Sequence, residues 1–289
     1  DLHYPLRRQR QMCIRDRVNV GDEVQFHGQV LFAVVARSQV LARKAARLGI
    51  VEYEEKTPSI SIESGLANKE FVLPSHEQVS GVPELAIRNA QRQLAGEVST
   101  GGQEQMYLEG QVSLCVPLED GGMSVYTSSQ NPAEGQKLVA EVLKIPMSMV
   151  TVEVRRMGGA FGGKETNANQ WACIAALLAN KVKRPVKLRL ARADDIRVTG
   201  KRHHFLSRYE VGFNSQGVIS GLDLELAAGC GMSPDLSGSI VDRAMFHADN
   251  AYYLGNARVI GHRVKTNTCL LYTSPSPRDA TLSRMPSSA

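Results

Sequence analysis

The pattern of apolar and polar residues near the start of the chain predicts a strand, a helix and a second strand. Residues 30–36 form a continuous apolar run, which is typical of a buried strand. Residues 38–48 place apolar side chains at helical spacing, with Ser38 as a candidate N-cap and Gly49 as a stop signal. Because residues 50–53 return to a strand pattern, this region predicts a small β–α–β unit.

The remainder of the chain continues to mix the two kinds of element. Residues 107–116 and 123–128 predict the two arms of a hairpin around a Gly-Gly turn. A helix, a strand, a second helix and three strands are expected next, at residues 133–143, 149–154, 170–180, 186–190, 205–213 and 218–228. This order of elements predicts an α+β fold class.

A cluster of glycines separates the strand pattern at 149–154 from the helix pattern that follows it. The cluster and the two residues after it are Gly158, Gly159, Gly162, Gly163, Lys164 and Glu165. A glycine loop between a strand and a helix turns backbone N–H groups toward an anion at the helix N-terminus. Glycine also permits positive φ and close contact between the backbone and a ligand. The sequence therefore predicts a ligand-binding loop at residues 156–165.

Two other interpretations of this loop are considered. Residues 158–164 fit the pattern GxxxxGK, which suggests a P-loop that binds a nucleotide. A P-loop needs Ser or Thr at the next position to hold Mg²⁺, whereas this chain has Glu165, whose charge repels a triphosphate. The second interpretation is that the glycines only pack the helix against the sheet. The clustering of four glycines around Phe161 disfavours that second interpretation.

Both ends of the chain resemble translated sequencing adapter. Residues 7–17 are what a transposase-type adapter encodes, and residues 269–279 match the reverse-side adapter. Residues 283–289 resemble the primer sequence beyond it. We therefore expect residues 1–17 and 269–289 not to be native, and we leave them out of the interpretation of the fold.

This exclusion changes the charge balance. The whole chain has 34 Lys and Arg against 29 Asp and Glu, a net charge of +5. Removing the seven basic and three acidic residues of the two ends leaves 27 against 26, a net charge of +1. The basic character that would suggest nucleic acid or a membrane surface thus disappears. No apolar run approaches the roughly 20 residues of a membrane span, so we expect neither partner.

The sequence predicts no metal-ligand cluster. The cysteines between the two ends are Cys115, Cys173 and Cys230, without a CxxC pair, so neither a zinc site nor an iron–sulfur site is encoded. Scattered cysteines are typical of buried positions in a reducing compartment, which predicts a cytoplasmic protein. The pair His203-His204 lies in a strand pattern, where neighbours point to opposite faces, so both are interpreted as structural.

Several motifs together identify a family. Residues 157–165, Met-Gly-Gly-Ala-Phe-Gly-Gly-Lys-Glu, resemble the pterin-contacting loop of the molybdenum hydroxylases, the xanthine dehydrogenase and aldehyde oxidase family. Further motifs carry the resemblance through nearly all of residues 18–268, in order, at 101–109, 127–131, 199–205 and 240–247. Within the family, the chain is most similar to the molybdenum-binding chain of bacterial xanthine dehydrogenases. The resemblance implies part of an α/β hammerhead-like domain at 18–66, a connector at 67–95, and the N-terminal part of a molybdopterin-binding domain at 96–268.

The resemblance also implies roles for particular residues. Phe161 and Gly162 match the loop whose backbone approaches the molybdenum cofactor. Gln130 matches a glutamine that forms a hydrogen bond to an oxo ligand of molybdenum. Glu165 and Arg243 match the catalytic pair that holds a purine and stabilises the charge developing on it. No residue of this chain is expected to bind a metal directly.

Each polar residue of this set also has a local interpretation. Gln130 precedes Asn131-Pro132 and is compatible with a turn. Arg243 lies near Asp242 and Asp235, so a surface ion pair is an alternative. Glu165 stands before the helix pattern, where a first-turn carboxylate would be favourable.

The resemblance implies an oxidoreductase that hydroxylates xanthine or hypoxanthine at a molybdenum–pterin centre, with water as the oxygen source. Electrons would pass through 2Fe–2S clusters and FAD, held by partner domains or subunits, to NAD, and the complete assembly is expected to be a homodimer. An aldehyde or N-heterocycle hydroxylase with the same cofactor is the alternative, although the Glu165 and Arg243 pair favours a purine. The general base of the family lies beyond residue 268, so this chain alone is expected to be inactive.

Overall fold

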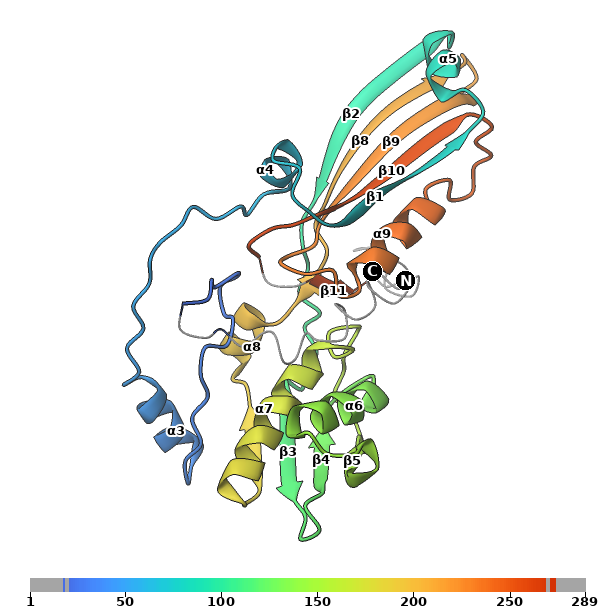
Figure 1. Cartoon of the computed structure of the whole chain (residues 1–289). Helices are drawn as coiled ribbons and strands as arrows, with labels where there is room; N and C mark the ends of the chain where they lie inside the picture. The colour runs from blue at the N-terminus through green and yellow to red at the C-terminus, as the bar shows by residue number, and fades with distance from the viewer. Residues whose placement is uncertain (1–17, 19–20, 269–270, 274–289) are drawn as a thin grey trace, which may run out of the picture. The chain divides into compact units, whose positions relative to one another are not determined.

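The computed structural model describes residues 18, 21–268 and 271–273 (Figure 1). The chain divides into two compact units, each assembled from two separate stretches of sequence. Of the described residues, the first unit contains those up to residue 58 and residues 105–200, and the second contains residues 59–104 and those from residue 201 onward.

The first unit is built on a four-stranded sheet with the order β5-β4-β3-β6. Its strands are β3 (Val112–Pro117), β4 (Met123–Thr127), β5 (Val150–Glu153) and β6 (Val186–Arg189). The β3–β4 and β3–β6 pairs are antiparallel, whereas β4 and β5 are parallel. The antiparallel β3–β4 pair confirms the predicted hairpin, although its first arm begins five residues later than expected.

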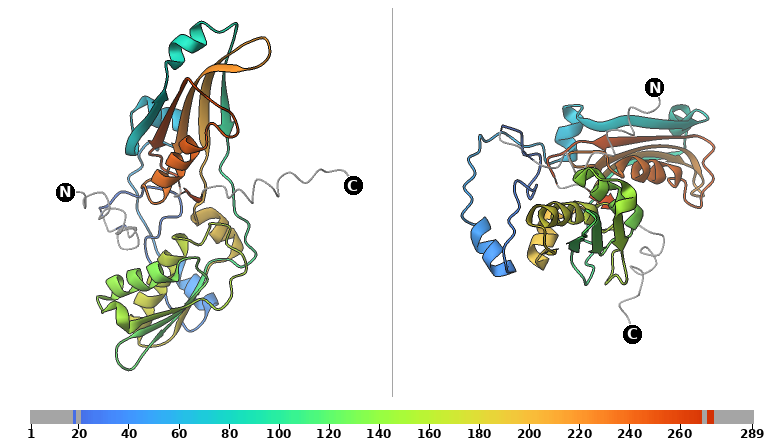
Figure 2. Two further views of the ribbon diagram at one scale, coloured as in Figure 1. Left: turned by 90° about the vertical axis from the view of Figure 1, so that its right-hand side faces the viewer. Right: turned by 60° about the horizontal axis from the view of Figure 1, so that its bottom comes forward.

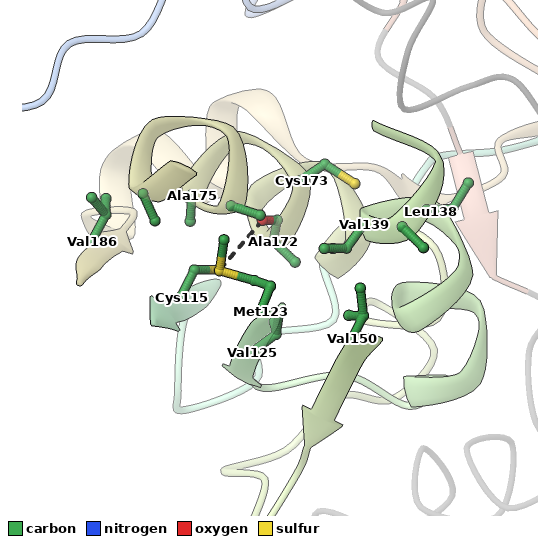
Figure 3. Packing of buried hydrophobic residues seen from close by; sticks show 13 residues of the cluster. Cys115, Met123, Val125, Leu138, Val139, Val150, Ala172, Cys173, Ala175 and Val186 are labelled. Carbon is green, nitrogen blue, oxygen red and sulfur yellow. Dashed lines mark hydrogen bonds between the residues drawn. The ribbon is translucent and has the colours of Figure 1, made fainter. Parts of the chain in front are cut away.

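Two helices cover one face of this sheet, α6 (Pro132–Leu143) and α7 (Asn167–Val182) (Figures 2 and 3). Asn131 caps α6, because its side chain accepts a hydrogen bond from the Glu134 N–H at 3.2 Å. The buried face of α7 is rich in alanine, so the helix approaches the strands closely and Cys115 Sγ lies 3.6 Å from the Ala172 carbonyl oxygen (Figure 3).

The prediction of strands at residues 30–36 and 50–53 is wrong, because neither segment forms β structure. The helix between them exists as α3 (Gln39–Ala46), and Ser38 caps it as predicted by accepting from the Leu41 N–H at 3.3 Å. A strand forms only where a neighbour completes its backbone hydrogen bonds, and no described strand pairs with either segment. The first unit also contains a short 3₁₀ turn, η1 (Met147–Met149), and α8 (Arg192–Val198).

The second unit contains a five-stranded sheet with the order β1-β10-β9-β8-β2. Its strands are β1 (Phe71–Ser80), β2 (Arg92–Thr100), β8 (Phe205–Phe213), β9 (Ile219–Gly229) and β10 (Ala257–Val264). Only the β9–β10 pair is parallel among the described pairs of this sheet. The helices are α4 (Ile62–Ala67), α5 (Pro83–Arg88) and α9 (Ser237–Phe246), and α9 packs Val241 and Met245 against the sheet beside β10 (Figures 1 and 2).

The α+β class is confirmed, and β8 has the predicted bounds, residues 205–213. The strands β1, β2 and β10 and the helix α9 were not predicted. The case of β1 shows the reason: it contains Pro74 and is mostly exposed after Leu73, so its sequence lacks the alternation of a half-buried strand. Pairing with β10, nearly two hundred residues away in sequence, makes it a strand.

Most of the predicted adapter-derived residues, 1–17 and 269–289, lie outside the described residues. The exception is β11 (Leu271–Thr273), which pairs in parallel with the two-residue strand β7 (Lys201–Arg202). The adapter origin of the ends and the domain boundaries at residues 18–66, 67–95 and 96–268 stay predictions.

The core between the sheet and α6/α7 predicts a large cost for truncating Met123, which is 1 % exposed. Met123→Ala should lower the free energy of unfolding by about 2–5 kcal/mol, because it removes buried methylenes and leaves a cavity. Met147→Ala is the matched control: this side chain is 45 % exposed, so the change should stay within about 0.5 kcal/mol. Urea unfolding followed by the fluorescence of Trp171, the one tryptophan, measures both, and equal effects would contradict the assigned core.

Candidate functional site

The glycine loop joins β5 to α7, as its sequence predicts. Phe161 and Gly162 both have left-handed backbones, with φ values of 51° and 86°. Glycine takes this conformation readily, but for a phenylalanine it costs roughly 1–2 kcal/mol. The ring of Phe161 is nevertheless 59 % exposed, so contacts with described residues do little to offset that strain. A strained and exposed aromatic residue at the tip of a loop indicates a binding role.

The back of the loop packs against residues 107–111, which were predicted as strand. A Cβ at Gly163 would lie 2.6 Å from Cε1 of Tyr107, so only glycine fits there without displacing the ring. Gln111 Nε2 donates to the Gly163 carbonyl at 3.0 Å, and the Glu109 N–H donates to the Gly158 carbonyl at 3.0 Å. Residues 107–111 therefore do not extend β3, which begins only at residue 112: the Glu109 N–H is bonded to the loop and the Gln111 N–H to Asp195.

Lys164 has a fully buried side chain behind the same loop. Its Nζ donates to Ser128 Oγ at 2.7 Å, forms an ion pair with Glu109 Oε1 at 3.3 Å and lies 4.8 Å from the centroid of the Tyr107 ring. Burial lowers the pKa of Lys164, while the charge of Glu109 acts in the opposite direction. A P-loop lysine must reach phosphate, so this buried and bonded ammonium contradicts the P-loop hypothesis.

Gln130 lies beside Lys164 and is exposed. The Gln130 N–H donates to the Lys164 carbonyl at 2.9 Å, and Gln130 Oε1 accepts from the Lys164 N–H at 3.2 Å. Because only the oxygen of a carboxamide can accept, this contact fixes its orientation and leaves Nε2 as the donor that Gln130 can offer to a ligand. Gln130 therefore does more than complete a turn.

Glu165 follows Lys164 and is half-buried. Burial raises the pKa of its carboxyl group, and the nearby charge of Glu134 raises it further. The helix α7 begins at Asn167 with Thr166 as its N-cap residue, and its first turn contains no acidic residue. The interpretation of Glu165 as a first-turn carboxylate is therefore wrong, since it belongs to the loop.

Arg243 lies on α9 in the second unit, whereas Gln130, Phe161, Gly162 and Glu165 all belong to the first. Its side chain is exposed. The neighbouring carboxylate of Asp242 bonds instead to the buried Arg263 and to His76, the latter at 2.8 Å. Among the described residues no ion pair includes Arg243, so the surface ion-pair interpretation is not supported.

The histidine pair does not form a metal site in the described part of the chain, where no three His, Cys, Asp or Glu side chains cluster. His203 and His204 lie in the loop between β7 and β8, and not on a strand as predicted. His203 is buried with Nε2 2.8 Å from Ser237 Oγ, and the His204 ring packs on Gly229. Burial lowers the pKa of His204. Both histidines therefore have structural contacts.

The three described cysteines are free and buried, as predicted. Burial raises the pKa of Cys115 to about 12, and that of Cys230 to about 12. A thiol that stays protonated at neutral pH is a poor nucleophile and a poor metal ligand. These residues therefore belong to the core.

A buried polar network supports the loop and was not predicted. Tyr107 Oη donates to Asp195 Oδ1 at 2.8 Å, and the Gln111 N–H donates to Asp195 Oδ2 at 2.8 Å. Gln111 Nε2 also donates to Tyr107 Oη at 3.1 Å. Burial, together with the carboxylate of Asp195, raises the pKa of Tyr107. Asp195 lies on α8, far from the others in sequence, so no local pattern reveals the network.

Removing the hydroxyl of Tyr107 tests the contribution of this network. Tyr107→Phe should destabilise the chain by about 1–3 kcal/mol, because Asp195 and Gln111 each lose a buried partner. Tyr126→Phe is the control, since Tyr126 is 38 % exposed and its hydroxyl has no such role. Urea unfolding measures both variants, and an unchanged Tyr107→Phe midpoint would contradict the network.

The burial of Glu165 predicts a pH-dependent effect on stability. A carboxyl group with a raised pKa costs stability when it is ionised, and this cost disappears once the pH falls below its value in the unfolded chain, about 4.3. Glu165→Gln should therefore raise the melting temperature at pH 7 and leave it unchanged near pH 4. The exposed Glu119, replaced by Gln, is the control. A lower melting temperature for Glu165→Gln at pH 7 would show that the charge is stabilised in the fold.

Comparison with known proteins agrees with these features. The family model described as "Molybdopterin cofactor-binding domain" matches residues 67–271. The xanthine dehydrogenase of Dictyostelium discoideum is 38% identical over 252 residues, covering 87% of this chain and 19% of that protein. The nicotinate hydroxylase of Emericella nidulans is 38% identical over 251 residues, covering 85% of this chain and 19% of that protein.

The fold also matches solved structures. The aldehyde oxidoreductase from Desulfovibrio gigas superposes with a TM-score of 0.75 at 21% identity, over 83% of this chain and 27% of that chain. This chain spans about a fifth of the length of the curated relatives that it matches. With the family model covering most of the sequence, the chain belongs to the molybdenum hydroxylase family, and its glycine loop lies within the molybdopterin cofactor-binding domain.

Proposed function

We propose that this chain provides the cofactor loop and part of the substrate site of an enzyme that hydroxylates a purine such as xanthine or hypoxanthine. The observation that supports it most is that Gln130 forms two hydrogen bonds with the backbone of Lys164. Lys164 lies in the loop with the family motif, and Glu165 is the next residue. Relatives named as xanthine dehydrogenases support the substrate class.

The residues of the loop fit a large cofactor that is contacted mainly through the backbone. Phe161 is exposed at positive φ, Gly162 presents a backbone without a side chain, and Gln130 offers an amide donor. When bound, a molybdenum–pterin group supplies the oxidising centre and the oxygen, derived from water, that a ring carbon receives. In this proposal Gln130 donates a hydrogen bond to a ligand of that centre, and Phe161 and Gly162 line its edge.

Glu165 and Arg243 are the proposed catalytic residues. The carboxyl group of Glu165, whose pKa burial raises, is suited to sharing a proton with a ring nitrogen. The guanidinium of Arg243 remains charged at all relevant pH values and stabilises negative charge on the ring in the transition state. The match of both residues to the family's motifs supports this assignment.

A second candidate is the hydroxylation of an aldehyde or another N-heterocycle with the same cofactor. One specific observation favours it: a relative at 38% identity is named nicotinate hydroxylase, no less similar than the xanthine dehydrogenase from Dictyostelium. The Glu165 and Arg243 pair argues for a purine over an aldehyde, because a heterocycle that accumulates negative charge is stabilised by an arginine.

The proposal includes the rest of the electron route. FAD and 2Fe–2S clusters on partner domains or subunits would carry electrons to NAD in a homodimeric, cytoplasmic assembly. This chain covers 19% of the Dictyostelium relative, so the rest of that relative is long enough to contain such modules. No helix within the described residues is long and apolar enough to cross a bilayer.

Arg243→Met in the full-length protein encoded at the genomic locus tests the purine assignment. Loss of a charge-stabilising donor should lower kcat/KM for xanthine about 10²–10³-fold, with unchanged molybdenum content. Arg184→Met, at an exposed position before β6, is the control. A wild-type enzyme that oxidises nicotinate or an aldehyde but no purine would establish the second candidate instead. The 289-residue chain alone should give no purine-dependent dye reduction.

A further inference from the structure

Three consecutive residues of the first unit, Ser128, Ser129 and Gln130, all form hydrogen bonds with Lys164. Ser128 Oγ accepts from its ammonium at 2.7 Å. Ser129 Oγ donates to its carbonyl at 3.4 Å. Gln130 uses both its backbone N–H and its side-chain oxygen, at 2.9 and 3.2 Å. One residue of the glycine loop is thus bonded to residues 128–130 of the segment between β4 and α6.

The ammonium itself is anchored on the opposite side. Glu109 Oε1 lies 3.3 Å from Nζ, and the Tyr107 ring lies 4.8 Å from it. The Glu109 N–H also holds the Gly158 carbonyl at the start of the loop. Lys164 therefore connects the loop to two separate segments, residues 107–109 and 128–130.

Stability alone is a weak reason for a lysine at this position. Removing an ammonium from water is costly, and buried ion pairs often stabilise no more than apolar side chains of the same size. A buried charge does, however, require hydrogen-bond acceptors at particular positions. One such acceptor here is Ser128, two residues before Gln130, the side chain that the proposed function assigns to the cofactor.

We propose that Lys164 is a positioning residue of the cofactor site. Its ammonium fixes Ser128, which places Gln130 so that its oxygen accepts from the loop and its Nε2 group faces the cofactor. This inference rests on the proposed function, because it assigns Lys164 a role that acts through Gln130. Lys164 does not touch the cofactor in this proposal.

Four variants of the complete holoenzyme test the proposal: Lys164→Met, Ser128→Ala, Gln130→Ala and the double variant Lys164→Met/Gln130→Ala. Lys164→Met should lower kcat/KM about 10–100-fold, the usual effect of removing a group that orients a ligand residue. The double variant should be no worse than Gln130→Ala alone, since in this proposal Lys164→Met acts only by misplacing the Gln130 side chain, which Gln130→Ala already removes. The electron paramagnetic resonance signal of the molybdenum should change in the same way in Lys164→Met and Gln130→Ala.

Lys181→Met, at an exposed position near the end of α7, is the matched control and should behave as wild type. If Lys164→Met does not fold, Ser128→Ala provides the same comparison, because it removes the acceptor and leaves the lysine in place. Molybdenum content per polypeptide is measured for every variant, so that loss of cofactor is separated from misplacement of Gln130.

Two results would overturn the inference. One is a double variant whose loss is the product of the two single losses; the other is a wild-type resonance signal in Lys164→Met when Gln130→Ala alters it. A different result would overturn the proposed function itself: wild-type protein without molybdenum, or a Gln130→Ala variant with unaltered signal and activity. The two failures are thus distinguishable.

Discussion

The burial of the Lys164 ammonium is the constraint on which the first unit depends. A cation that is removed from water needs hydrogen-bond acceptors in the protein. Ser128 and Glu109, which belong to two separate segments of the chain, provide them. The hairpin, the glycine loop and the start of α7 therefore have to meet at one place. The tight contact between Gly163 and Tyr107 and the buried hydroxyl of Tyr107 follow from that meeting, because they fill the remaining space around the charge.

This arrangement separates two roles within one short loop. Its buried side supplies rigidity, through the hydrogen bonds from residues 109 and 111 to the carbonyls of Gly158 and Gly163. Its exposed side keeps the strained Phe161, and the amide of Gln130, which is bonded to the loop from the segment between β4 and α6, adds a donor that a ligand can use. Because such a loop is already ordered before a ligand binds, binding does not carry the entropic cost of ordering it.

The elements that depend on local sequence pattern were predicted correctly from the sequence. Those that depend on contacts with distant segments of the chain were not. Residues 205–213, which end at a local turn signal, form β8 as predicted, and Asn131-Pro132 opens α6. The apolar run at 30–36 has strand propensity but no partner, whereas β1 lacks the propensity and gains a partner in β10. In the site, the motif identified the loop, but the burial of Lys164 depends on residues 36 and 55 positions earlier in the chain, which no local pattern connects.

The parallel pairing of β9 and β10 has a consequence for how substrate choice can change. Parallel neighbours cannot be joined by a tight turn, so residues 230–256 must cross over the sheet, and α9 with Arg243 is part of that crossover. The ladder between the two strands is formed by backbone groups, and the exposed side chain of residue 243 takes no part in it. Under the proposed function, a different residue at this position would change the preferred substrate while the sheet keeps its register.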